Sequence, residues 1–465
     1  MAPRLGIFKH NGVTYPKAHT PNLPKNLYPD TALISQKKWQ DIMDYFYSAA
    51  PKKLKFPKPR KKIKTGNLFF TPSTPKYHAK APPMVSSIRF DPGNKVIYLS
   101  NASNDEFMVF NKKLRLMDHL NLSSTLSDIK FLNNSSQPGN RKFLLTYIGA
   151  GSLSPSDALN GSVMRSSYNP QNKKARKGYY VIKHIDRPVE SQMADLNGDG
   201  KPDYIIDDFG FRKGSLFWLK NEGNKKVSKK RILSNTPGCI KSVVTDFNHD
   251  GRPDVVALCT QSQEAIYLFQ NQGKGKFKRK TLLQFPPVYG SSSFELDDFN
   301  HDGRPDILYT SGDNSDYSKI YKPYHGVYIF LNEGNDKFKK AWFYHINGAY
   351  NAKARDFNHD GRLDIAVISF FADYKHRPQE GFVFFKNNGN LSFTPYHPPA
   401  TSKGRWITMD VADWTGNGYP DILLANFSMG PKGPMSSKFA KKMQKKWKHD
   451  PMFLLLKNHA NSNKK

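Results

Sequence analysis

Several features that would assign a class of protein are absent from this sequence. No apolar run approaches the ~18 to 20 residues that a membrane-spanning helix requires, so no spanning segment is expected. The opening residues, MAPRLGIFKHNG, lack the apolar core of a secretory signal peptide. No Cys-x-x-Cys-His motif occurs, which excludes a covalently attached haem in this chain. No Ser/His/Asp order, nucleophile elbow or phosphate-binding loop is recognisable, so the sequence assigns no catalytic residue.

Acidic residues are few beside basic ones, with 39 Asp and Glu against 71 Lys and Arg and a net charge of +32. The positive charge is concentrated in residues 51–64, with eight Lys or Arg in fourteen positions, and 441–448, with five Lys in eight. Such runs contact nucleic acid, anionic lipid or polyanionic glycan, or they are solvated linkers. No nucleic-acid-binding motif accompanies them, so we expect no specific nucleic-acid partner and leave open a contact with an anionic surface.

One acidic, glycine-containing stretch recurs five times, which identifies a repeat protein. The copies are DLNGDGKPD (195–203), DFNHDGRPD (246–254), DFNHDGRPD (298–306), DFNHDGRLD (356–364) and DWTGNGYPD (413–421). Within each copy, oxygen-bearing side chains occupy positions 1, 3, 5 and 9, and the backbone carbonyl of position 7 adds a further oxygen. A set of carboxylate, amide and carbonyl ligands suits Ca²⁺ ahead of Mg²⁺ and far ahead of Zn²⁺.

Four copies have the complete ligand set, and the fifth does not. The expected metal ligands are Asp195, Asn197, Asp199, Lys201 and Asp203; Asp246, Asn248, Asp250, Arg252 and Asp254; Asp298, Asn300, Asp302, Arg304 and Asp306; Asp356, Asn358, Asp360, Arg362 and Asp364; and Asp413 with Asp421. Thr415 and Asn417 occupy positions 3 and 5 of the last copy, so we expect about four calcium sites and a weak or absent fifth. The alternative is that Asp, Asn and Gly only form tight turns.

The flanks of these loops are short β-type runs, such as KSVVT before and VVALCT after the second copy. Loop, spacing and flanks resemble the FG-GAP/VCBS repeat family, whose integrin-α-like members are β-propellers with calcium between the first two strands of a blade. A second recurring element also matches this family: an apolar run, an Asn/Gly turn such as NEGNKK or NQGKGK, and a final strand. The resemblance implies four strands in each unit.

The number of units follows from their spacing. Successive copies begin 51, 52, 58 and 57 residues apart, and two further paired strand runs without the ligands lie at 85–101 and 128–149. We therefore predict an all-β fold, a seven-bladed β-propeller over residues 81–465. Its ring should be closed by the apolar run 452–458 or by a strand from near 70 to 90.

Residues 1–80 are expected to form an N-terminal extension with a basic linker and one amphipathic helix at 35–50. Ser35 is the candidate N-cap, Trp39 lies on the apolar face, and Pro51 ends the helix. This helix resembles the closing helix of a c-type cytochrome domain, which precedes such propellers in some bacterial relatives. Either it is a remnant that packs on the propeller, or the sequence lacks an upstream part that would also hold a signal peptide.

Cys239 and Cys259, the only cysteines, flank the second acidic loop. In an antiparallel hairpin centred on that loop they would lie nearly opposite each other, within reach of a disulfide; the alternative is two separate buried thiols. Cytosolic calcium is too low to fill loops that bind like extracellular modules. These two observations favour an extracytoplasmic location, whether periplasmic, cell-surface or secreted.

The connections between the second and third strands should lie on the face opposite the calcium loops, and several are long. Residues expected around the channel mouth there are Glu264, Asp313, Asp316, Tyr324, His325, Asp373, Arg405 and Trp406. They suit a carbohydrate or protein ligand, unless they only join neighbouring blades. We expect a monomeric, non-enzymatic binding module; the alternatives are an enzyme acting on an extracellular polysaccharide and an accessory protein to a c-type cytochrome electron-transfer system.

Overall fold

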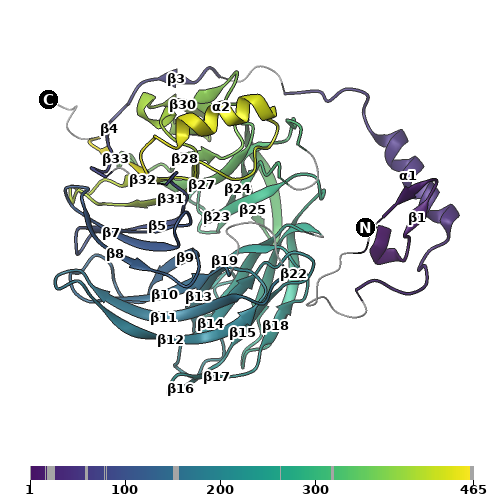
Figure 1. Cartoon of the computed structure of the whole chain (residues 1–465), viewed down its shortest axis with the longest axis horizontal. Helices are drawn as coiled ribbons and strands as arrows, with labels where there is room; N and C mark the ends of the chain where they lie inside the picture. Colours follow the sequence, from purple (N-terminus) through teal and green to yellow (C-terminus); the bar gives the residue numbers. More distant parts are fainter. Residues whose placement is uncertain are drawn as a thin grey trace.

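The computed structural model describes residues 2–15, 17, 27–57, 61–77, 79, 81–149, 157–261, 263–315 and 319–460. It is a seven-bladed β-propeller, which confirms the predicted all-β fold (Figure 1). Each blade is an antiparallel sheet of four strands that follow one another along the chain, except where the N-terminal segment completes the last blade.

The first two blades carry no acidic loop. Blade 1 consists of β5 (Val85–Asp91), β6 (Val96–Asn101), β7 (Glu106–Asn111) and β8 (Leu116–Asn121). Blade 2 consists of β9 (Leu126–Phe131), β10 (Arg141–Tyr147), β11 (Gly161–Asn169) and β12 (Lys174–Ile185). In place of a cluster of loop carboxylates, Asp91 of blade 1 forms a buried ion pair with Arg141 of blade 2 at 2.5 Å.

The remaining five blades carry the acidic loops between their first and second strands. Blade 3 consists of β13 (Pro188–Ala194), β14 (Asp203–Asp208), β15 (Ser215–Leu219) and β18 (Arg231–Ser234), with a hairpin of β16 (Asn221–Gly223) and β17 (Lys226–Val227). Blade 4 consists of β19 (Cys239–Thr245), β20 (Asp254–Cys259), β21 (Glu264–Asn271) and β22 (Phe277–Phe285). Blade 5 consists of β23 (Ser291–Asp297), β24 (Asp306–Ser311), β25 (Gly326–Gly334) and β26 (Lys337–His345). Blade 6 consists of β27 (Ala349–Arg355), β28 (Asp364–Ser369), β29 (Phe382–Asn387) and β30 (Phe393–His397), to which β3 (Lys64–Thr65) adds a parallel strand. Blade 7 consists of β31 (Trp406–Ala412), β32 (Asp421–Asn426), β33 (Phe453–Asn458) and β4 (Phe70–Ser73).

The first strand of each blade lies innermost, because the first strands of all neighbouring blades contact one another in a closed ring. Most second strands are largely apolar and buried along their whole length, as in Asp254–Cys259 and Asp306–Ser311. Their side chains pack between two adjacent blades; Val256 and Leu258 of blade 4, for example, share a cluster with Phe294 and Ile307 of blade 5. A strand covered on both faces needs a continuous apolar run, which explains why these strands do not alternate.

Both segments that the sequence offered for ring closure take part in it. The N-terminal strand β4 pairs antiparallel with β33 as the outer strand of blade 7, with Phe70 opposite Asn458. Phe70 is buried and packs edge-on against Phe384 of blade 6, with ring centroids 5.1 Å apart. The chain therefore closes the ring by lending a strand from its beginning to its last blade.

The N-terminal segment contains α1 (Gln36–Ala49), close to the predicted bounds. Ser35 caps this helix by accepting a hydrogen bond from the backbone N–H of Lys38, and Trp39 is buried with Ala2 and Ile7. The sequence did not predict the 3₁₀ turn η1 (Ala2–Leu5) or the hairpin of β1 (Lys9–His10) and β2 (Val13–Thr14) that accompany it. This unit lies beside the propeller in Figure 1.

A second helix, α2 (Ser437–Trp447), occupies part of the basic run that the sequence also allowed to be a linker. It belongs to the connection between β32 and β33, and Ala440 and Trp447 bury its inner face against Tyr374. The short 3₁₀ turns η2 (Pro378–Gly381) and η3 (Pro399–Ser402) complete the regular elements. Within the described part of the chain, no helix has the length and apolar character needed to cross a membrane.

Removing the Phe70 ring should weaken ring closure. We expect Phe70→Ala to lower the free energy of unfolding by about 3 to 5 kcal/mol, the usual cost of truncating a buried phenylalanine. Urea unfolding followed by tryptophan fluorescence measures the change. The matched control is Phe56→Ala, since Phe56 is 49% exposed and its loss should cost much less; equal costs for the two variants would contradict closure through β4.

Candidate functional site

The five acidic loops share one turn. Position 1 follows the last residue of the first strand, and position 9 opens the second strand. In the second loop, His249 at position 4 and Gly251 at position 6 have positive φ angles of 58° and 82°, and the third and fourth loops repeat this pattern. Glycine is favoured at position 6 for this backbone angle, because nothing lies within 4 Å of where its Cβ would be.

The carboxylates at positions 1 and 5 of the first four loops hold the turn together. In the second loop Asp246 accepts hydrogen bonds from the backbone N–H groups of Asp250 at 3.0 Å and Gly251 at 2.8 Å. Asp250 accepts one from the N–H of Arg252 at 3.0 Å and forms an ion pair with its guanidinium group. Equivalent pairs join Arg304 to Asp302, Arg362 to Asp360 and, at 3.1 Å, Lys220 to Asp199.

The carboxylate at position 9 of each loop has a different role. Asp254 is fully buried, and its two oxygens accept the backbone N–H groups of Phe247 at 3.2 Å and of Asn271, in the third strand, at 2.7 Å. All five loops repeat this bond to an asparagine, at 2.7 to 2.8 Å. The asparagine lies in the third strand of four blades and begins β16 in blade 3; the pairs are Asp203 with Asn221, Asp254 with Asn271, Asp306 with Asn332, Asp364 with Asn387, and Asp421 with Asn458.

These asparagines were missed as structural residues, although their recurrence in NEG, NQG and NNG was visible in the sequence. Each side-chain amide donates to the carbonyl of the residue before its aspartate. In two blades it also reaches the preceding blade: Asn271 donates to the carbonyl of Leu196 at 3.0 Å, and Asn458 to that of Phe357 at 2.8 Å.

The loops fit a calcium ion in ligand type but hold their carboxylates in other contacts. Position 5 is exposed and position 1 is half-buried in the first four loops, and position 3 supplies an amide oxygen. Over the described ranges, no three or more His, Cys, Asp or Glu side chains converge to hold a metal ion. In the fifth loop Thr415 bonds to Asp421 at 3.1 Å, and the Asn417 amide donates to the carbonyl of Asn458 at 2.8 Å, so both substituted side chains are engaged elsewhere.

Cys239 and Cys259 lie directly opposite each other in the pairing of β19 with β20 and form a disulfide bond. Both residues are buried, and the bond encloses the hairpin that carries the second acidic loop. It lies at the end of the hairpin away from the loop.

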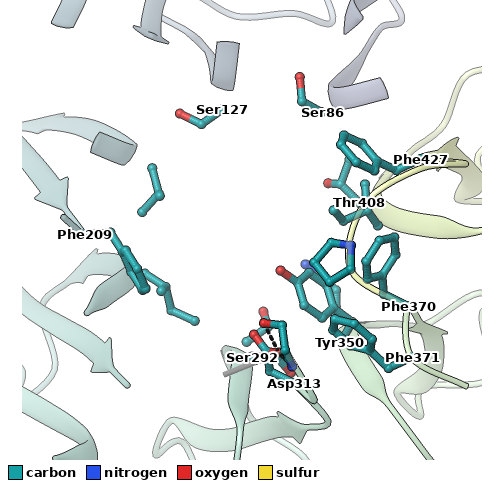
Figure 2. A pocket seen from close by; sticks show the side chains of 18 of the residues that line it. Ser86, Ser127, Phe209, Ser292, Asp313, Tyr350, Phe370, Phe371, Thr408 and Phe427 are labelled. Atoms are coloured by element: carbon teal, nitrogen blue, oxygen red, sulfur yellow. Dashed lines mark hydrogen bonds between the residues drawn. The ribbon is translucent and has the colours of Figure 1, made fainter. Parts of the chain in front are cut away.

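A cavity of about 1030 Å³ occupies the centre of the ring (Figure 2). Its wall is built from the beginnings of the first strands, such as Ser86 and Tyr350, and from residues at or just after the ends of the second strands, such as Phe209 and Phe427. Because the acidic loops lie at the other end of these strands, the cavity is on the opposite face, where a ligand site was predicted.

Charged side chains of the first strands form a belt in the cavity and join neighbouring blades. The ion pairs are Arg89 with Asp128 at 2.7 Å (blades 1 and 2), Lys130 with Glu190 at 2.5 Å (blades 2 and 3), and Lys353 with Glu295 (blades 6 and 5). Burial alone would raise the pKa of Glu295, but Lys353, Lys241 and Arg355 hold it at about 2. Burial, followed by the charge of Lys353, lowers the pKa of Lys241 to about 8.

The residues predicted to surround the channel mouth do not form one site. Asp313 lines the central cavity. Asp373 lines a separate pocket of about 500 Å³ with Glu380, and it lies 3.1 Å from the Nδ1 atom of His376. Glu264 is buried and accepts the backbone N–H groups of Gly290 and Ser291, which joins blades 4 and 5. Asp316 lies outside the described residues.

The other four predicted residues pack against their neighbours. Tyr324 stacks on Tyr289 with ring centroids 4.3 Å apart, and burial raises its pKa to about 12. His325 is fully buried, which lowers its pKa to about 3. Arg405 is fully buried, with its guanidinium carbon 3.6 Å from the Phe370 ring centroid, and Trp406 donates to the carbonyl of Thr401 at 2.9 Å.

Arg405 and Trp406 therefore join neighbouring blades, which is the alternative to ligand binding that the sequence left open. The belt residues on the first strands were missed. The sequence pattern could have indicated them, because charged residues alternate with apolar ones in DIK (128–130) and ELD (295–297). Such alternation is expected of a strand with one face toward solvent.

The family model for FG-GAP-like repeats matches residues 195–257 and 246–309. A search of curated proteins gives no match. Similar solved structures include BBS1N in complex with ARL6DN, at 9% identity and a TM-score of 0.47 over 85% of this chain and 99% of that one. The WD40 repeats of RRP9 match at 8% identity and a TM-score of 0.46, over 86% of this chain and 100% of that one.

The disulfide should stabilise blade 4. We expect the double variant Cys239→Ser, Cys259→Ser to lose about 2 to 4 kcal/mol of unfolding free energy, since a cross-link restricts the unfolded chain. Reducing the native protein with dithiothreitol should produce a similar loss, measured by urea unfolding. The double variant is its own control, because reductant should leave it unchanged; a native protein that is insensitive to reductant would contradict the bond.

Proposed function

Since the chain is a seven-bladed β-propeller with FG-GAP-like repeats, we propose that it is a calcium-binding, non-enzymatic interaction module that acts outside the cytoplasm. Its ligand, a carbohydrate or a protein segment, occupies the central cavity on the face opposite the acidic loops. The observation that carries this proposal is the cavity itself, about 1030 Å³ within a closed ring. That volume is at the upper end of the range for ligand pockets.

The lining of the cavity supports a ligand with both apolar and polar parts. Tyr350, Phe370, Phe371 and Phe427 lie together along one side, with Phe209 across from them (Figure 2). Serines and charged residues of the first strands complete the wall. Aromatic faces with a few fixed polar groups are the usual composition of a small-molecule or saccharide site.

Calcium would be held by the carboxylates at positions 1 and 5 and the amide at position 3 of the first four loops, with the carbonyl at position 7. It would neutralise the clustered carboxylates and fix the hairpin that begins each blade. The ion pair between Arg252 and Asp250 does not oppose this, because its side chains are 46% and 23% exposed. Exposed pairs of this kind contribute only about 0 to 1 kcal/mol, so a divalent cation can displace the arginine.

The disulfide supports an extracytoplasmic location, since such bonds persist in oxidising compartments. Exposed lysines and arginines on the outer strands of blades 2 to 5, as in Lys174–Ile185 and Phe277–Phe285, supply a contact for an anionic surface. Charged side chains on edge strands also oppose edge-to-edge pairing, which supports a monomer.

Chelation tests the role of calcium. We expect EGTA to lower the melting temperature, and Asp250→Ala to lower it less than chelation does, because the variant removes a ligand from one site only. The EGTA-induced shift should be smaller in Asp250→Ala than in the native protein. In the control Asp413→Ala, whose loop has the incomplete ligand set, the shift should equal the native one. Calorimetry measures all three, and a native melting curve that ignores EGTA would count against structural calcium.

A glycan and peptide array with a parallel hydrolysis assay tests the binding module against the enzyme alternative. We expect retention of a ligand without turnover. The comparison variant Tyr350→Ala should weaken retention, because its ring lines the cavity. Hydrolysis of a bound polysaccharide would instead establish an enzyme, with Asp373 and Glu380 of the separate pocket as the first carboxylates to substitute.

A further inference from the structure

The charged belt leaves one cation without an acidic partner. Going round the ring, carboxylates of blades 2, 3 and 5 pair with cations of blades 1, 2 and 6. Lys241 of blade 4 lies between the last two pairs, and its ammonium group donates only a long hydrogen bond of 3.4 Å to the hydroxyl of Ser293. Among the described residues, no carboxylate lies within ion-pair distance of it. Glu190 and Glu295 face it, but each already pairs with another lysine.

We infer that Lys241 is the anion-binding residue of the central cavity, and that the ligand is an acidic oligosaccharide whose uronic-acid carboxylate pairs with it. This inference rests on the proposed binding function of the same cavity. It adds the charge of the ligand, its chemical class and the residue that recognises it.

The cavity lining as a whole has an excess of positive charge. Eight basic residues line it against three acidic ones, an excess of five positive charges. The basic residues are Arg89, Lys130, Arg187, Lys241, Lys319, Lys353, Lys432 and Lys441, and the acidic ones are Asp128, Glu190 and Asp313. A concave wall with one excess sign of charge concentrates ligands of the other sign.

Lys241 is the member of this set best placed to gain from an anion. It is half-buried and lines the cavity, so it has lost part of its hydration without gaining an acidic partner. Its pKa of about 8 leaves it mostly protonated at neutral pH. A ligand carboxylate would supply the missing partner at a half-buried position, where charge pairing is stronger than at the surface.

The neighbouring side chains favour a saccharide over an acidic peptide. Ser86 and Ser127 place half-buried hydroxyl groups on the first strands that line the cavity, as does Thr408 (Figure 2). The half-buried Tyr350 supplies an aromatic face on the same wall (Figure 2). Sugar rings have C–H faces that pack on aromatic rings and hydroxyl groups that bond to polar side chains.

The test is calorimetric titration of the full chain with oligosaccharides of galacturonate, mannuronate and glucuronate, and with their methyl esters. We expect the native protein to bind at least one acidic oligosaccharide and to bind its neutral ester at least tenfold more weakly. Lys241→Met should weaken binding of the acid at least tenfold, while Lys241→Arg retains most of it. Lys442→Met, which removes an exposed lysine of α2 outside the cavity lining, should bind as the native protein does.

Thermal unfolding checks that the variants fold, and Lys241→Met should be at least as stable as the native protein, because it removes an unpaired cation. Unchanged acid binding by Lys241→Met, or equal binding of acid and ester, overturns the inference while leaving a binding cavity in place. Tighter, Lys241-dependent binding of oligoglutamate overturns the saccharide in favour of an acidic peptide. Retention of no glycan or peptide by the native protein overturns the proposed function together with the inference.

Discussion

A buried aspartate that accepts a backbone N–H from an asparagine near the end of the third strand is the contact on which each loop-bearing blade depends. Asp254 joins three points of its blade: the acidic loop through Phe247, the start of the second strand, and the end of the third strand through Asn271. A fully buried carboxylate without these bonds would cost several kcal/mol, so the residue is required whether or not a cation is present. This explains the fifth loop, where positions 3 and 5 have changed but Asp421 keeps its bond to Asn458.

The parts of the fold that could be predicted from the sequence are those that depend on local repetition. The acidic loops, the Asn/Gly turns and the apolar second strands recur at a regular spacing, which is sufficient for the blade count. The helix α2 was not predicted, although Phe439, Ala440, Met443 and Trp447 recur at helical spacing, because the lysine-rich run 441–448 was interpreted as a solvated linker or a contact for a polyanion. The surroundings of Arg405 depend on Phe370 and on carbonyls of a connection more than twenty residues away, as in its bond to Met429. No spacing rule reports such a contact.

The first strand of each loop-bearing blade runs from the central cavity to the acidic loop on the opposite face. Lys241 and Asp246 belong to the same blade, one within β19 and the other directly after its last residue. The acidic loop therefore fixes one end of a strand whose middle lines the cavity, and the disulfide fixes the other end. The arrangement of the belt is thus set by the hairpins rather than by the loops around the mouth. That is why the mouth residues expected from sequence are dispersed, while the cavity wall is continuous.

The positive charges of the chain are hydrated on the outer strands and mostly ion-paired on the inner strands. On the outer strands, unmatched lysines remain hydrated, where a charge costs little and a pair contributes little. In the belt, three carboxylates of the first strands each face a cation of a neighbouring blade, as expected where desolvation makes an unpaired charge expensive. Lys241 breaks this rule within the cavity, although the same strands place Glu190 and Glu295 on either side of it. A ring that pairs the other cations of its first strands across blade boundaries could have paired this one as well, so the exception is better explained by a ligand than by the fold.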